Sequence, residues 1–402
     1  MTLTLFLRLQ LMVFLHYFVW GAWFVTMGTY LHSTLKFEGA QIGLAYGSTA
    51  IGAMVSPFFA GIIADRFFAT QRLLGCLHLV GAALLYYVST TKSFGAFYPA
   101  LIAYTITYMA GHGLTNALTL HHAKNPAKEF PLVMLMGSIG WIAAGLVVSA
   151  LKFEDSAGMF HLAAGAALVM GLYSFTLPNT PPKGAGAPIN LRTMLGLDAL
   201  KLMRDRSFAT FMICSFLICV PLSFYFSWMH IFMGEMKIAK TAMKMTGAQV
   251  SDVVFLLLLP FLLRRLGVKG ILILGMVAWT VRFGLLTQSV QASGTAWMIF
   301  VAIAVHGMCY DYIFVMGRMY VDERATPDIR AATQGFHAFV TLGAGMFIGS
   351  MLAGIVGQHY TNAADNSHAW KNIWLVPAVM SAVLIVIFAV LFKDGGEKAK
   401  ST

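Results

Sequence analysis

Apolar stretches of about 20 residues recur along almost the whole chain, and only short polar segments separate them. An α-helix needs a stretch of this length to cross the hydrocarbon core of a bilayer. Because backbone polar groups in lipid must be bonded within the spanning segment, helices are the expected structure. We therefore predict an all-α membrane protein with about twelve transmembrane helices, near residues 7–32, 41–64, 73–90, 96–120, 131–151, 157–178, 207–233, 247–263, 270–290, 296–320, 333–357 and 371–392.

Composition leaves little room for a soluble domain. Of 402 residues, 58% are hydrophobic and 11% are charged, whereas a typical soluble domain is about 25% charged. The net charge of +11 comes from Lys and Arg residues scattered singly or in pairs between the apolar stretches. This distribution forms no basic patch, so we do not expect nucleic acid as a partner. The expected partner is the lipid bilayer.

The longest polar stretch, 179–206, lies between the sixth and seventh predicted helices. We therefore predict an N-terminal six-helix half (1–178), a central loop (179–206) and a C-terminal six-helix half (207–402). Most Lys and Arg residues fall in alternate loops, which predicts that both termini and the central loop are cytoplasmic. The string His112-Gly113-Leu114 in the fourth span has a counterpart, His306-Gly307-Met308, in the tenth, as expected of two related halves.

Several strings carry a resemblance to known transporters. Gly61-Ile62-Ile63-Ala64-Asp65-Arg66 resembles the loop between the second and third helices of the major facilitator superfamily. A more specific, collinear set resembles the nucleoside:proton symporter family of that superfamily, in its branch of less-defined nucleoside transporters: Trp20-Gly21-Ala22-Trp23-Phe24, Gly137-Ser138-Ile139-Gly140-Trp141, Leu195-Gly196-Leu197-Asp198-Ala199, Gln249-Val250-Ser251-Asp252, Tyr310-Asp311-Tyr312 and Ile329-Arg330-Ala331-Ala332-Thr333-Gln334-Gly335.

The resemblance implies the major facilitator fold and a monomer in the inner membrane of a bacterium. It also implies import of nucleosides or similar small polar metabolites with protons, by alternating access. Two departures keep alternatives open. Met134 stands where the family usually has an arginine, and Ser223 and Phe226 stand at polar positions of the well-defined nucleoside carriers. An uncoupled facilitator, a symporter for another solute such as a sugar, and a non-transporting receptor are the alternative functions.

No feature of the sequence indicates an enzyme. The chain lacks Gly-x-Ser-x-Gly, His-Glu-x-x-His and P-loop motifs. Its four cysteines lie inside apolar stretches, and none has metal-site spacing. We therefore expect no cofactor and no bound metal.

Asp311, in the tenth span, is the candidate proton-coupling residue. An ionised carboxylate at mid-membrane costs several kcal/mol, so acids there usually face a cavity or a partner. The resemblance adds weight to a proton-binding role. A neutral acid that only bonds a neighbouring helix is the alternative.

Gln249 and Asp252 are the leading substrate-binding candidates. They are three residues apart and therefore share one helix face, and the resemblance implies that this face binds substrate. Tyr310 could stack on a planar base, although a packed tyrosine is as plausible. The further candidates for substrate contact are Asn116, Thr115, His230, Ser223 and Phe226.

Other polar residues in or near spans have different predicted roles. Asp65, Arg66 and Arg330 are candidate gating residues that form cytoplasmic ion pairs. Arg282 lies in the ninth span, which is usually peripheral in this architecture, so a structural partner or a snorkelling side chain is favoured there.

Overall fold

The computed structural model describes residues 1–402 apart from 67, 182–196, 291–293, 328 and 394–402, and it does not describe the side chains of 58–66, 127, 197–198 and 331. Within that description the chain is helical, and its only β-type pairing is one bridge between Thr361 and His368. The prediction of an all-α fold is confirmed.

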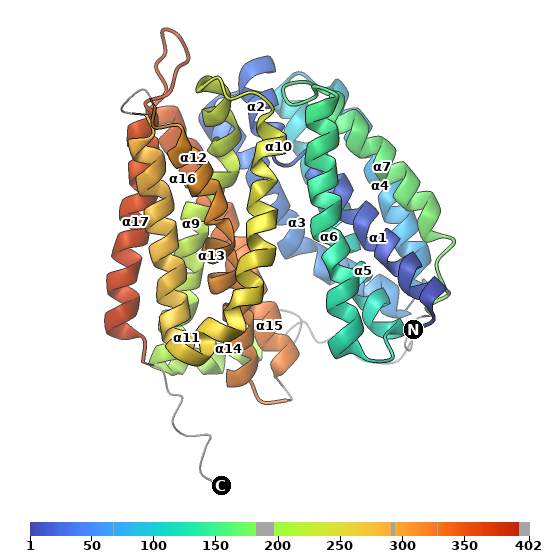
Figure 1. The fold of residues 1–402 in the computed structure, drawn as a ribbon. Helices are drawn as coiled ribbons and strands as arrows, with labels where there is room; N and C mark the ends of the chain where they lie inside the picture. Colours follow the sequence, from blue (N-terminus) through green and yellow to red (C-terminus); the bar gives the residue numbers. More distant parts are fainter. Residues whose placement is uncertain (67, 182–196, 291–293, 328, 394–402) are drawn as a thin grey trace. The chain divides into compact units, whose positions relative to one another are not determined.

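The chain divides into two compact units. The first comprises Met1–Ile189 and Phe226–Thr246. Within it α1 packs against α6 and α7, α3 packs against α5, and α4 packs against α5 and α7 (Figure 1). Its helices are α1 (Leu3–Gly21), α2 (Met27–Thr29), η1 (Tyr30–Thr34), α3 (Gly39–Arg66), α4 (Thr70–Thr90), α5 (Phe94–His122), α6 (Pro126–Ala150), α7 (Gly158–Ser174), the end of α9 (Arg206–Glu235) and α10 (Thr241–Met245).

The second unit comprises Asn190–Tyr225 and Gly247–Thr402, and it includes the start of α9. Within it α11 packs against α12, α13 and α17. Its other helices are η2 (Leu197–Arg204), α11 (Gly247–Gln288), α12 (Trp297–Ala304), α13 (His306–Tyr310), η3 (Asp311–Val315), α14 (Met316–Arg324), α15 (Arg330–Ala338), η4 (Phe339–Gly345), α16 (Met346–His359) and α17 (Trp370–Leu391).

The predicted spans fall largely on these helices. In the described residues, seven helices are long and apolar enough to cross a membrane, or eight if α12 and the helix after it form one bent span. α11 contains two predicted spans, and Gly267 (φ 65°, ψ 179°) breaks the helix between them. A residue without Cβ adopts this left-handed φ at little cost. The chain is a multi-pass membrane protein, and the span count of about twelve stays a prediction.

The predicted domain boundaries also stay a prediction. Most of the central loop, 179–206, lies outside the described residues. The two compact units do not follow the predicted halves along the chain, because Phe226–Thr246 groups with the first unit.

Candidate functional site

A sharp bend interrupts the predicted tenth span. α12 and the helix that starts at His306 meet at an angle of 45°. The Ser251 hydroxyl of α11 lies at this break, where it donates to the Ala304 carbonyl (2.5 Å) and accepts from the Gly307 amide (2.9 Å). A Cβ at position 307 would lie 2.5 Å from the Ser251 carbonyl oxygen, so only glycine permits this approach. A side chain inserted into the hydrogen-bond ladder is a common cause of helix kinks.

Asp311 begins the π-helical segment η3, one turn after the bend. π-helical turns within α-helices are frequent at functional sites. The Asp311 side chain is buried inside the second unit, with 5% of its surface exposed, and Oδ2 has no hydrogen-bond partner among the described residues. Asp252 and Arg318 are the charged residues that interact with it electrostatically. Asp311 is therefore a buried acid with an unused oxygen, beside a second acid.

Asp252 and Gln249 lie in the first turns of α11, and both are half-buried. Oδ1 of Asp252 is buried and has no hydrogen-bond partner in the described part of the chain. Tyr310 interacts electrostatically with both Asp252 and Asp311. The ring of Tyr310 stacks on His306, with centroids 5.9 Å apart. The fold thus brings the predicted residues Asp252, Tyr310 and Asp311 into one cluster.

Arg282 belongs to the same cluster. Its side chain is fully buried, and Nη1 lies 2.7 Å from Nδ1 of His306. Since arginine has no acceptor, the guanidinium donates this bond and His306 accepts it as a neutral ring. The guanidinium carbon lies 3.6 Å from the centroid of the Tyr225 ring, in cation–π contact. Of the two alternatives favoured for Arg282, the structure agrees with a structural partner, His306, and excludes a snorkelling side chain, because no part of Arg282 reaches the surface.

The first unit has a buried polar cluster of a different kind. Nδ1 of His78 lies 3.1 Å from the Leu74 carbonyl and must donate to it. In a neutral pair, Nε2 of His78 then accepts from Nδ1 of His16, 3.2 Å away. This assignment leaves Nε2 of His16 as a bare acceptor, and it has no partner among the residues that the structure describes. The His16 ring stacks on Tyr108, with centroids 4.4 Å apart.

Asn116 and Thr115 of α5 lie near this cluster in sequence but differ in what they offer. Thr115 is fully buried, and its hydroxyl donates to the His112 carbonyl (2.9 Å). Asn116 is half-buried, and its Oδ1 has no hydrogen-bond partner within the described residues. Of these two candidates for substrate contact, Asn116 is the one with an available polar atom, Oδ1.

The candidates on α9 are engaged in packing. The Ser223 hydroxyl, in the second unit, is fully buried and donates to the Cys219 carbonyl at 2.8 Å. Phe226, in the first unit, packs edge-on against Phe24 with ring centroids 5.3 Å apart. Ser223 therefore has its hydroxyl already committed to the backbone.

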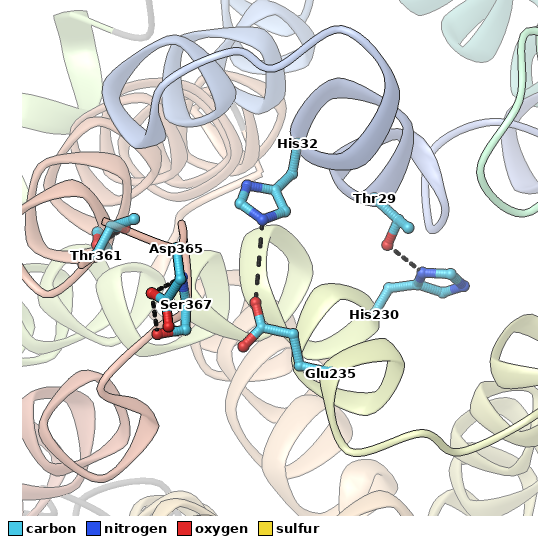
Figure 2. Close-up of polar contacts among 8 residues, drawn as sticks. Thr29, His32, His230, Glu235, Thr361, Asp365 and Ser367 are labelled. Atoms are coloured by element: carbon cyan, nitrogen blue, oxygen red, sulfur yellow. Dashed lines mark hydrogen bonds and ion pairs between the residues drawn. The ribbon is translucent and has the colours of Figure 1, made fainter. Parts of the chain in front are cut away.

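His230 lies further along α9, in the first unit. Figure 2 shows its ring turned toward Thr29 of α2, and a hydrogen bond of 2.5 Å joins Nδ1 to Oγ1. One turn away, Nε2 of His32 lies 3.9 Å from the Glu235 carboxylate (Figure 2). Nε2 of His230 is buried and has no partner in the described structure.

The candidate gating residues are only partly described. Arg330 pairs with Asp322 of the second unit at 3.3 Å, and the two side chains are 52% and 46% exposed. Asp65 and Arg66 lie at the end of α3, and their side chains are outside the described residues.

The comparisons with known proteins agree with the fold. The family described as Nucleoside H+ symporter matches residues 1–397. The chain belongs to this family.

Relatives of this symporter-family chain cover it almost completely. YegT of Escherichia coli (strain K12) is 36% identical over 96% of this chain and 93% of its own length. The xanthosine permease of the same organism is 30% identical, over 98% of this chain and 97% of the permease. The crystal structure of the nucleoside transporter NupG matches with a TM-score of 0.88 at 30% identity, covering 98% of this chain and all of that one.

Membership of the symporter family confirms the major facilitator fold and a transporter rather than an enzyme. Sequence reasoning named most of the second unit's cluster but did not connect Arg282 to His306, which is 24 residues away. It also did not consider His78 or Tyr225. No local signal marks either one, because His78 meets His16 and Tyr225 meets Arg282 only when two helices pack.

Proposed function

We propose that this protein imports nucleosides together with protons by alternating access, as its family membership and its relatives suggest. The observation that carries the proposal is the buried pair of acids in the second unit. Asp252 and Asp311 each have a buried oxygen without a hydrogen-bond partner among the described residues. Desolvated acceptors of this kind are costly unless a substrate, a proton or water satisfies them.

Asp311 is the proton-coupling residue in this proposal. Taking up a proton converts Oδ2 from an unpaired acceptor into a donor or a neutral group, which lowers the cost of burying it. Releasing the proton restores that cost and favours a conformation in which the carboxylate meets water. Proton binding and the direction of opening are thereby linked.

Asp252, Gln249 and Tyr310 form the substrate-binding group of the second unit. A carboxylate accepts hydrogen bonds from the hydroxyls of a ribose, and an amide can donate to and accept from a base edge. The Tyr310 ring offers a face for stacking. In the first unit, Asn116 is the candidate for substrate contact, because its Oδ1 has no hydrogen-bond partner within the described residues. Thr115, Ser223, Phe226 and His230 already have hydrogen-bond or packing partners in this structure, and they serve in the proposal as support for their helices.

The location follows from the surface of the helices and the loop charges. Large apolar side chains are exposed along them, including Leu172, Leu257 and Val390 at 57%, 76% and 69%. Such surface is unfavourable in water and suits contact with hydrocarbon. The distribution of Lys and Arg favours both termini in the cytoplasm. A monomer in the inner membrane of a bacterium is proposed from the family resemblance alone.

Transport by the purified protein in liposomes tests the proposal. With an inwardly directed proton gradient, labelled xanthosine, uridine and adenosine should accumulate, sucrose should not, and an uncoupler should abolish accumulation. Accumulation of sucrose instead would favour the alternative of a sugar symporter, for which the committed Ser223 hydroxyl and the apolar Phe226 are the supporting observations. Equilibration of nucleoside across the membrane without proton flux would favour the alternative of an uncoupled facilitator.

A further inference from the structure

We propose that Arg282 is a positioning residue that compensates the charge of Asp252, so that Asp252 remains an ionised acceptor while Asp311 alone exchanges a proton. The substrate and proton parts of this inference rest on the proposed function. The pairing of Arg282 with Asp252 does not.

The argument starts from a cation that cannot be neutralised or reach water. Arg282 is fully buried in α11, and a guanidinium keeps its proton in proteins. A buried charge without a compensating partner is strongly destabilising. Within the predicted spans of the C-terminal half, the sequence contains only two acids, Asp252 and Asp311.

The direct contacts of Arg282 do not supply a negative charge. Nη1 donates to the neutral ring of His306 at 2.7 Å, and the Tyr225 ring covers the guanidinium at 3.6 Å. Nε and Nη2 have no hydrogen-bond partner in the part of the chain that the structure describes. Neutral groups therefore hold the guanidinium in place, and Nε and Nη2 remain as donors without an acceptor.

Asp252 is the acid suited to those donors. Arg282 interacts electrostatically with Asp252, whereas the charged residues that interact with Asp311 are Asp252 and Arg318. Oδ1 of Asp252 is buried and unpartnered within the described residues. Both residues belong to α11, on either side of its break at Gly267. Arg282 thus has donors without an acceptor, and Asp252 has an acceptor without a donor.

This arrangement gives the two acids different roles. One fixed cation can balance one carboxylate, and repulsion between Asp252 and Asp311 opposes a second negative charge beside it. Arg318 is exposed, whereas Arg282 is fully buried, so Arg282 is the cation held inside the cluster. The group of Arg282, Asp252 and Asp311 is neutral when Asp311 carries a proton and singly negative when it does not. Without Arg282 the pair of acids would be neutral only with a proton on each.

Thermal unfolding of purified variants in detergent tests the pairing without any transport assay. We expect Arg282→Met to lower the melting temperature and Asp252→Asn to lower it as well, since each leaves a buried charge alone. The double variant should melt closer to the native protein than either single variant. If Arg282→Met does not yield folded protein, the same cycle is run with Arg282→Gln.

Two comparisons separate this role from simple packing. Arg265 lies on the same helix over the ring of Phe261 (4.3 Å) but is exposed, so Arg265→Met should leave the melting temperature unchanged and show no coupling to Asp252→Asn. If the losses of Arg282→Met and Asp252→Asn simply add, the pairing is wrong and the arginine acts through Tyr225 and His306. Rescue of Arg282→Met by Asp311→Asn in place of Asp252→Asn would assign the cation to the other acid.

Transport adds a readout that a packing role would not change. In Arg282→Lys, which keeps the charge, we expect the KM for nucleoside to rise several-fold while the number of protons moved per nucleoside stays native. A change in that ratio with KM unchanged would contradict the division between the two acids. If the native protein moves no nucleoside at all, the proposed function fails while the melting experiment still decides the pairing.

Discussion

The buried polar clusters of the two units are built from different chemistry. In the first unit, His16 and His78 bond to each other, His78 also donates to the Leu74 carbonyl, and Tyr108 stacks on His16. In the second unit, Asp252 and Asp311 lie in one cluster with Arg282. The first arrangement can be neutral throughout, whereas the second always contains a cation. A charge that changes with proton binding has the larger effect where charge is already present, so the comparison supports our proposal that the second unit couples proton binding to transport.

The largest effect is expected at Asp311. Asp311→Asn keeps the shape of the side chain but cannot exchange a proton, so proton-driven uptake should fall by at least about 100-fold. Uptake and proton flux in liposomes measure it. Asp365→Asn, an exposed loop acid of the same unit, is the control and should behave as the native protein does. Undiminished proton-dependent uptake by Asp311→Asn would contradict the proposal that the second unit, and not the first, couples proton binding to transport.

The next effect concerns the bend at Ser251. Ser251→Ala leaves the Ala304 carbonyl and the Gly307 amide without their shared partner, which should cost about 1–3 kcal/mol. We expect a lower melting temperature and slower uptake, because the helix that carries Asp311 can straighten. Ser350→Ala is the matched control, since that buried hydroxyl has no partner in the described residues. Equal effects of the two substitutions would show that the bend does not depend on the hydroxyl.

The first unit gives a more moderate prediction. His78→Leu removes the donor to Leu74 and the acceptor for His16, so stability should fall by about 1–3 kcal/mol. The number of protons moved per nucleoside should not change, because this cluster is neutral in our interpretation. Simultaneous measurement of nucleoside and proton flux provides the check. A lower proton ratio in His78→Leu would mean that both units take part in coupling.

The smallest effect is expected at the exposed ion pair. Arg330→Gln breaks a contact whose partners are 52% and 46% exposed, and such pairs contribute less than about 1 kcal/mol. The melting temperature should therefore hardly change, and any difference should disappear at high salt. A gating role would instead appear as a changed maximal rate of uptake at unchanged stability. Asp322→Asn should reproduce whatever change Arg330→Gln causes.

Much of the architecture could be predicted because lipid imposes a simple rule. A segment that crosses the bilayer must be about 20 residues long and apolar. It must also be helical, because lipid offers no partners for backbone polar groups. The helices fall largely on the predicted spans. The bend in the tenth span was not predicted, because its cause is a hydroxyl from another helix. The break in α11, by contrast, lies between the predicted spans 247–263 and 270–290, where Gly267 interrupts the helix.

The sequence by itself determined the helical membrane fold, the family and the two acids Asp252 and Asp311, since these depend on local composition and on strings of adjacent residues. Only the tertiary structure decided which polar atoms have partners. It paired Arg282 with His306 and His16 with His78. The reason is that a hydrogen bond or a buried charge pair depends on distances of a few ångströms between helices, and spacing along the chain does not encode those distances.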